Sequence, residues 1–135
     1  MRASILALCV ALVQSQPDTG RLSTRGRNTY FILEPGYRLT LEGTESGRRV
    51  ELVVTVLNET HTVAGVATRV VEERERHDGQ LAEVSRNYFA IDPVTTDVYY
   101  FGEDVDIYER GRIVNHEGAW LAGGRGARFG LMMPG

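Results

Sequence analysis

Apolar and polar residues alternate with a period of two along most of the chain. The alternation runs through Tyr37 to Glu42 and again through Arg49 to Leu57, a segment rich in β-branched residues. Successive side chains of a strand point to opposite faces of a sheet, and β-branched residues favour strands. Both segments are therefore predicted to be strands with one buried face.

A long hairpin gives the clearest local signal. Val66 to Arg76 leads into Asp78-Gly79, and Leu81 to Ile91 follows. Asp-Gly is a preferred pair for a two-residue type I′ turn, because both positions need positive φ. Further strands are predicted at Asn28 to Leu33, Val98 to Phe101, Asp104 to Tyr108 and Ile113 to His116, with polar loops at Gly43 to Gly47 and Asn58 to Thr60.

One segment could also form a helix. Val71 to His77 contains a run of charged residues, with pairs such as Glu72 and Arg76 at helical spacing. The run ends in a hairpin turn and follows β-branched residues, so we favour the exposed, twisted tip of a hairpin. The sequence thus predicts an all-β fold, an antiparallel meander that forms a barrel, a half-barrel or a sandwich.

The N-terminus has the features of a signal peptide. A single positive charge at Arg2 precedes an apolar run from Ala3 to Val13, and small residues follow near Ser15. The run is shorter than the roughly 20 residues that a membrane-spanning helix needs. We expect residues 1–15 to be removed on export to the periplasm or the medium. Residues 16–27 are then a flexible mature terminus, and residues 28–135 are the β-rich domain.

Charge and cysteine usage narrow the function classes. All 15 basic residues are arginine, and the formal net charge is −3. A mildly acidic chain without a basic run lacks the positive surface that nucleic acid requires, so no nucleic-acid partner is expected. The one cysteine, Cys9, lies in the signal segment, so the mature chain is expected to have no disulfide.

The chain resembles a group of uncharacterised exported bacterial β-rich proteins over residues 28–135. The most specific element is Tyr100 to Asp104, the sequence Tyr-Phe-Gly-Glu-Asp, and the likeness continues through Glu117 to Trp120 and into Gly130 to Pro134. This resemblance implies no activity. Because members of the group continue past the Met-Pro segment, it implies that the present chain is C-terminally truncated and its sheet incomplete. An unfinished sheet exposes an edge, through which we expect self-association.

The densest polar cluster lies between Glu103 and Glu117. Strand alternation places Asp104 and Asp106 on one face and Glu103 on the other, and His116-Glu117 follows after a short turn. Carboxylates on one face could bind Ca²⁺ or another divalent metal, with Asp104 and Asp106 as candidates, or act as acid and base. A solvated strand face is the simpler interpretation, and no cofactor is evident from the sequence.

Three aromatic residues are candidates for lining a ligand site, namely Tyr88, Tyr100 and Trp120. A non-catalytic module that binds a small apolar or peptide ligand is the favoured function, because no covalent nucleophile motif is present. The alternatives are a metal-dependent or acid–base hydrolase that uses Glu103, Asp104, Asp106 and His116, and a structural envelope protein.

Overall fold

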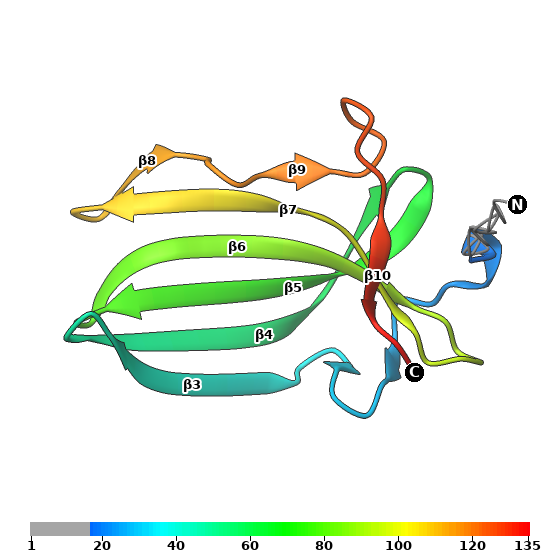
Figure 1. Ribbon diagram of the computed structural model, residues 1–135, viewed down its shortest axis with the longest axis horizontal. Helices are drawn as coiled ribbons and strands as arrows, with labels where there is room; N and C mark the ends of the chain where they lie inside the picture. Colours follow the sequence, from blue (N-terminus) through cyan, green and yellow to red (C-terminus); the bar gives the residue numbers. More distant parts are fainter. Residues whose placement is uncertain (1–16) are drawn as a thin grey trace, which may run out of the picture.

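The protein folds as an open, antiparallel sheet of long strands (Figure 1). The structure, a computed structural model, describes residues 17–135, so the predicted signal segment lies outside the described residues. The main sheet has the order β10-β7-β6-β5-β4-β3, and β8 and β9 also pair with β7. The predicted all-β antiparallel meander is confirmed, and the sheet does not close on itself.

Four long strands form the centre of the sheet. They are β4 (Arg48–Val63), β5 (Val66–His77), β6 (Gln80–Ile91) and β7 (Val98–Glu109). The remaining strands of the sheet are β3 (Arg38–Glu45), β8 (Arg112–Asn115), β9 (Trp120–Leu121) and β10 (Gly130–Met133), while β1 (Gly26–Arg27) and β2 (Ile32–Leu33) pair with each other. A short 3₁₀ helix (Thr19–Arg21) precedes them. The segment with helical spacing, Val71 to His77, lies in β5, as favoured from its flanking residues.

Two-residue turns connect the hairpins. The residue pairs Ser46-Gly47, Ala64-Gly65, Asp78-Gly79 and Arg110-Gly111 all have positive φ at both positions. Such turns have the twist of the strands that they join. The predicted loop at 43–47 is therefore wrong in extent, because β3 continues to Glu45 and the turn needs only two residues. The predicted loop at Asn58 to Thr60 is also wrong, since these residues lie inside β4, where the register against β5 shifts.

Residues 21–27, within the segment predicted to be flexible, pack against the sheet. Ser23 pairs with Ile91 through two backbone hydrogen bonds of 2.8 and 2.9 Å. The buried guanidinium of Arg69 donates to the carbonyls of Thr24 at 3.0 Å and Glu59 at 3.1 Å. Arg69 thus joins the irregular part of β4 to the N-terminal segment. These contacts lie in the segment that was predicted from the sequence to be flexible, and no local pattern there indicates them.

The sheet buries apolar residues on both of its faces. One cluster contains Val70, Tyr88 and Phe101, and we call the face that carries it the network face. The other cluster contains Val71 and Phe89, on what we call the acidic face. Both clusters lie toward one end of the long strands, and charged side chains occupy both faces toward the other end, near the turns at 46–47, 78–79 and 110–111.

Two bulges fix which side chains share a face. Glu75 is opposite Glu83 and Arg76 is opposite Leu81, so Ala82 is an extra residue in β6. Asn87 is opposite Glu103 and Phe89 is opposite Tyr100, so β7 has an extra residue at 101–102. A bulge reverses the alternation beyond it. The second bulge therefore moves Glu103 to the acidic face and Asp104 to the network face.

Gly102 permits the second bulge. Its φ is +124°, and a Cβ on it would lie 2.2 Å from the Trp120 carbonyl oxygen in β9. A side chain at this position would separate β9 from β7 in a backbone conformation that L-residues avoid.

Replacing Gly102 by alanine should therefore destabilise the fold by at least about 3 kcal/mol. Gly130→Ala is the matched control, because Gly130 is also in a strand paired to β7 and a Cβ there meets nothing within 4 Å. Urea unfolding measures both variants. Equal stability of the two alanine variants would contradict the role given to Gly102.

Candidate functional site

The polar cluster predicted from the sequence is divided between the two faces of the sheet. Asp104 and Asp106 lie on the network face, where Asp106 contacts the His116 ring at 3.0 Å. Glu103 lies on the acidic face, opposite Asn87. Glu117 is exposed in the turn after β8, where its N–H donates to Asn115. Of the five candidates, only Asp106 and His116 are in contact, and Asp104 shares their face of the sheet.

The network face balances its charges. Glu72 contacts Arg74 at 3.2 Å and Arg86 at 3.5 Å, and Arg86 also lies 3.7 Å from Asp106. These side chains come from β5, β6 and β7, so the ion pairs cross the sheet. Partly exposed pairs of this kind contribute little stability individually. Their effect is to leave few unpaired charges on this face.

The His116 ring has neither a nucleophile nor a set of metal ligands around it among the described residues. Nδ1 lies 2.8 Å from the Val105 carbonyl oxygen as well as near Asp106, and the side chain is 67% exposed. Among residues 17–135, no serine, threonine or cysteine side chain is hydrogen-bonded to this ring. A histidine–carboxylate pair supports nucleophilic catalysis only when a nucleophile lies within reach. Nor do any three metal-ligating side chains in the described part of the chain lie close enough to hold a metal ion together.

The three candidate aromatic residues have different surroundings. Tyr88 is buried, stacks on His61 at 4.7 Å and donates from its hydroxyl to Asp104 at 2.5 Å. Burial and this hydrogen bond raise the pKa of Tyr88, so it remains a neutral donor within the core. Tyr88 is therefore a structural residue and not a surface for a ligand.

Tyr100 and Trp120 lie next to each other and close to Glu103. Their rings meet edge to face at 5.3 Å, and β9 places Trp120 opposite Glu103. The Tyr100 hydroxyl donates to Asn87 at 2.8 Å, and burial followed by nearby Glu103 raises its pKa. Trp120 also borders a hollow of about 680 Å³ formed with the 124–127 loop. These two rings remain accessible candidates for ligand contact.

Four glutamates from three strands gather on the acidic face. Glu73 and Glu75 come from β5, Glu83 from β6 and Glu103 from β7. The two bulges place them on one face, with Glu75 directly opposite Glu83. Of these carboxylates, only that of Glu75 has an ion-pair partner among the described residues, His77 at 2.5 Å. This face therefore carries an excess of negative charge, unlike the network face.

The environment of these glutamates disfavours their ionised form. Burial, followed by the charges of Glu103, Glu83 and Glu75, raises the pKa of Glu73. Burial and neighbouring carboxylates also raise the pKa of Glu83. Burial raises the pKa of Glu103, which the Tyr100 hydroxyl partly opposes. Partly buried carboxylates that repel one another are a common feature of binding and catalytic sites.

Glu73 and Glu83 are not among the site residues predicted from the sequence. The charges of β5 were predicted to lie at an exposed hairpin tip, although Glu73 is half-buried. Strand alternation does separate Glu73 and Glu75 from Arg74 and Arg76, and this was the available signal. The position of Glu83 could not be obtained in this way, because the extra residue Ala82 changes the face on which it lies.

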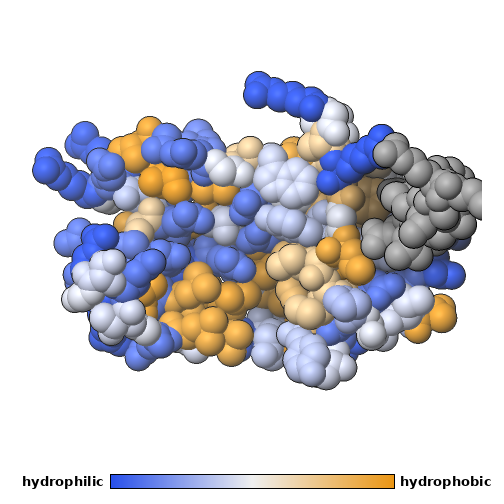
Figure 2. Space-filling view, in the orientation of Figure 1, coloured by the Kyte–Doolittle hydropathy of each residue, from blue (hydrophilic) through white to orange (hydrophobic). Residues whose placement is uncertain are grey.

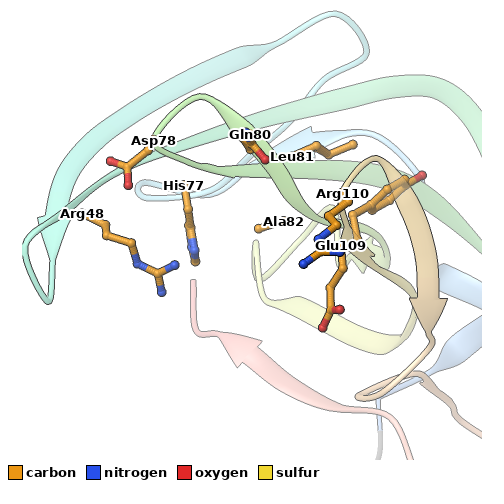
Figure 3. Close-up of a pocket in the computed structure, with 9 residues that line it drawn as sticks. Arg48, His77, Asp78, Gln80, Leu81, Ala82, Glu109 and Arg110 are labelled. Carbon is orange, nitrogen blue, oxygen red and sulfur yellow. The ribbon is translucent and has the colours of Figure 1, made fainter.

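A hollow at the hairpin end of the sheet is a weaker candidate. It encloses about 490 Å³ between the turns at 78–79 and 110–111 (Figure 3). Its lining contains both acidic and basic side chains, including Arg48, Glu109 and Arg110, which the figure shows projecting at its margin. The mixed charges give this hollow no preference for one sign of ligand.

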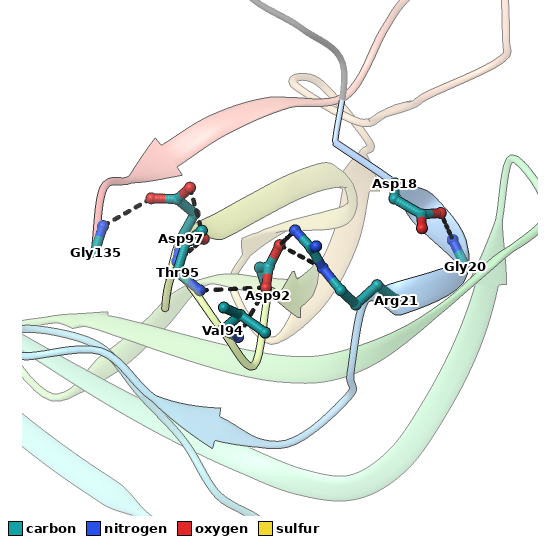
Figure 4. Close-up of polar contacts among 8 residues, drawn as sticks. All are labelled: Asp18, Gly20, Arg21, Asp92, Val94, Thr95, Asp97 and Gly135. Carbon is teal, nitrogen blue, oxygen red and sulfur yellow. Dashed lines mark hydrogen bonds and ion pairs between the residues drawn. The ribbon is translucent and has the colours of Figure 1, made fainter.

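The buried carboxylate of Asp92, at the other end of the sheet, has a structural role. Asp92 accepts the N–H groups of Val94 at 2.8 Å and Thr95 at 3.3 Å, and it pairs with Arg21 (Figure 4). Burial alone would raise the pKa of Asp92, but these donors outweigh it and the pKa is lowered. Its partners are all internal, so Asp92 fixes the turn and the N-terminal helix.

The comparisons with known proteins give no further guidance. No protein-family model, no curated protein and no solved structure matches this chain. The resemblance to exported β-rich proteins and the C-terminal truncation therefore remain predictions. No helix within residues 17–135 has the length and apolar character needed to cross a membrane.

Glu73→Gln should stabilise the protein at pH 7 by on the order of 1 kcal/mol, the usual size for relief of charge repulsion. The pKa of Glu73 is higher in the folded than in the unfolded chain, so its ionisation at neutral pH favours unfolding. As the pH falls through the folded-state pKa, the advantage of glutamine shrinks. It should vanish below the unfolded pKa of about 4.3.

Glu72→Gln is the matched control for this change, measured by urea unfolding between pH 3 and 8. Glu72 precedes Glu73 but faces the other way and pairs with Arg74 and Arg86, so its replacement should give no stabilisation. A Glu73→Gln variant that is less stable than the parent at pH 7 would contradict the account of the acidic face.

Proposed function

We propose that this chain is an exported, non-catalytic β module that binds a partner on its acidic face, and that the partner combines apolar and cationic groups. The observation that carries the proposal is the group of partly buried glutamates beside an exposed apolar surface on the same face of the sheet. Neither feature alone indicates a ligand class. Together they favour a cationic amphiphile or a basic, apolar peptide.

The apolar part of this surface comes from β3 and β4. We call it the apolar strip, defined as Leu39, Leu41, Val50, Leu52 and Val54. Cross-strand pairing sets Leu39 beside Val54 and Leu41 beside Leu52. Leu39 is 40% and Leu41 is 49% exposed. Figure 2 shows apolar atoms gathered over β3 and β4, next to hydrophilic atoms over the middle strands.

The distance between the apolar strip and the glutamates limits how far apart the apolar and cationic groups of the ligand can be. Leu52 is directly opposite Glu75 and Val54 is directly opposite Glu73 across the β4–β5 pair. Neighbouring strands are roughly 5 Å apart, so a ligand that lies across them meets carboxylates within one or two strand spacings of the strip. An alkylammonium ion, or a peptide with basic and aliphatic side chains in turn, fits this separation.

The charge of the ligand follows from the electrostatics of the glutamates. Burial raises the pKa of Glu73, Glu83 and Glu103, and neighbouring carboxylates raise the pKa of Glu73 and Glu83 further. A bound cation would reduce the repulsion between the carboxylates, whereas an anion would increase it. Binding energy is thus expected to depend on the sign of the ligand charge more than on the length of its apolar part.

Dodecylammonium should bind to the chain from Gln16 onward and change the fluorescence of Trp120, while dodecanoate and dodecanol should bind much more weakly. Trp120 is the only tryptophan of the chain and lies beside Glu103, so its emission reports on this face. Titration below the micelle concentration, at low and high salt, measures the dissociation constants.

Variants then locate the binding. Glu73→Gln and Glu103→Gln should each weaken dodecylammonium binding roughly threefold to tenfold. Glu72→Gln, on the network face, should leave it unchanged. Equal affinity for the cationic and anionic probes, or equal effects of Glu72→Gln and Glu73→Gln, would contradict the proposal.

A further inference from the structure

The strand β3 forms a free edge of the sheet. It is the last strand in the sheet order, and no described residue pairs with its outer side (Figure 1). All eight of its residues are exposed, and it pairs with β4 without a register shift. The opposite edge, on β7, is covered by β8, β9 and β10. A regular, uncovered edge strand of this length is a template for pairing with another strand.

The backbone groups of alternate β3 residues face outward. The carbonyl of Tyr37 accepts the N–H of Val56 in β4 at 2.9 Å, so this carbonyl points toward β4, while the N–H of Tyr37 donates to Glu34 in the preceding turn at 3.0 Å. Residues two apart on a strand share this direction, and those between them point the other way. The free N–H and C=O groups of the edge therefore belong to Arg38, Thr40, Glu42 and Thr44.

We propose that β3 pairs with β3 of a second copy of this chain, antiparallel, about a twofold axis at Thr40. This proposal does not depend on the proposed ligand. In this register Thr40 pairs with Thr40, and Arg38 of each copy is opposite Glu42 of the other. Both pairs join residues whose backbone groups point outward, as antiparallel hydrogen bonding requires.

Side chains on both faces complement one another in this register. Arg38 has no ion-pair partner within the described part of the chain, and Glu42 contacts only the exposed side chain of Arg49. On the other face, Leu39 of each copy is opposite Leu41 of its partner. Cross-strand apolar and opposite-charge pairs both stabilise antiparallel strands.

The same register fills a hollow beside Gly43. The hollow encloses about 290 Å³ and is lined by residues that include Leu41, Gly43 and Leu52, and nothing lies within 4 Å of a Cβ placed on Gly43. Pairing about Thr40 sets Tyr37 of one copy opposite Gly43 of the other. Tyr37 is 40% exposed, and an aromatic ring over a cross-strand glycine compensates for its missing side chain.

Other registers lose these matches. Only every second residue of β3 has outward-pointing backbone groups, so in other antiparallel registers the residue opposite Arg38 changes in steps of two. Such shifts place Thr40 or Thr44 opposite Arg38 and remove the ion pairs. A further shift sets Glu42 against Glu42, or Arg38 against Arg38, which repels. The segment from Tyr37 to Gly43 is therefore complementary to itself in one register.

Charge reversal tests the register directly. Sedimentation equilibrium of the chain from Gln16 onward should show a monomer–dimer equilibrium. R38E or E42R alone should weaken it at least about tenfold, because each puts like charges opposite one another. The double variant R38E/E42R should restore it to within about threefold of the parent, and an equimolar mixture of the two single variants should form heterodimers.

Two more variants and a control complete the test. Thr40→Pro should abolish the dimer without unfolding the monomer, because the N–H that it removes points outward. Tyr37→Ala should weaken the dimer. R112E makes the same charge reversal on β8 at the far edge and should have no effect. A monomeric parent at about 1 mM, a dimer insensitive to Thr40→Pro, or failure of the double variant to restore pairing would overturn the proposal.

Discussion

The two bulges in the central strands are the constraint on which the rest of the structure depends. Without the extra residues at Ala82 and at 101–102, Glu83 and Glu103 would lie on the network face, and Asp104 would lie among the glutamates. The second bulge needs Gly102, because a Cβ at this position would lie 2.2 Å from the Trp120 carbonyl oxygen. Backbone geometry at a few positions thus decides the charge of each face, since a bulge reverses the alternation that follows it.

The two faces of this one sheet consequently differ in their electrostatics. On the network face, arginines from β5 and β6 pair with carboxylates, and the polar groups satisfy one another. On the acidic face, glutamates are partly buried near Tyr100 and Trp120, with the apolar strip alongside. The cost of holding these charges together is the reason we propose a cationic ligand. Pairing through β3, as we also propose, would join two apolar strips across one continuous sheet.

Much of the strand order could be predicted from the sequence, because alternation and Gly-containing turns are local signals. The long hairpin with its turn at Asp78-Gly79 and the separation of Glu103 from Asp104 both agree with the structure. Bulges depend on contacts between distant strands, such as Gly102 with Trp120, so the alternation of side chains alone does not reveal them. The face of Glu83 and the packing of Arg69 against the N-terminal segment were therefore beyond sequence reasoning.

The central claim is that Glu73, Glu83 and Glu103 share a partly buried, electrostatically unfavourable face. Side-chain carboxyl titration by carbon-13 NMR measures it most directly, with the urea-unfolded chain as the reference. The three glutamates should titrate at higher pH in the folded than in the unfolded chain, and Glu103→Gln should lower the pKa of Glu73 and Glu83. Folded-state pKa values no higher than those of the unfolded chain, or an unchanged pKa of Glu73 and Glu83 in the Glu103→Gln variant, would contradict this claim.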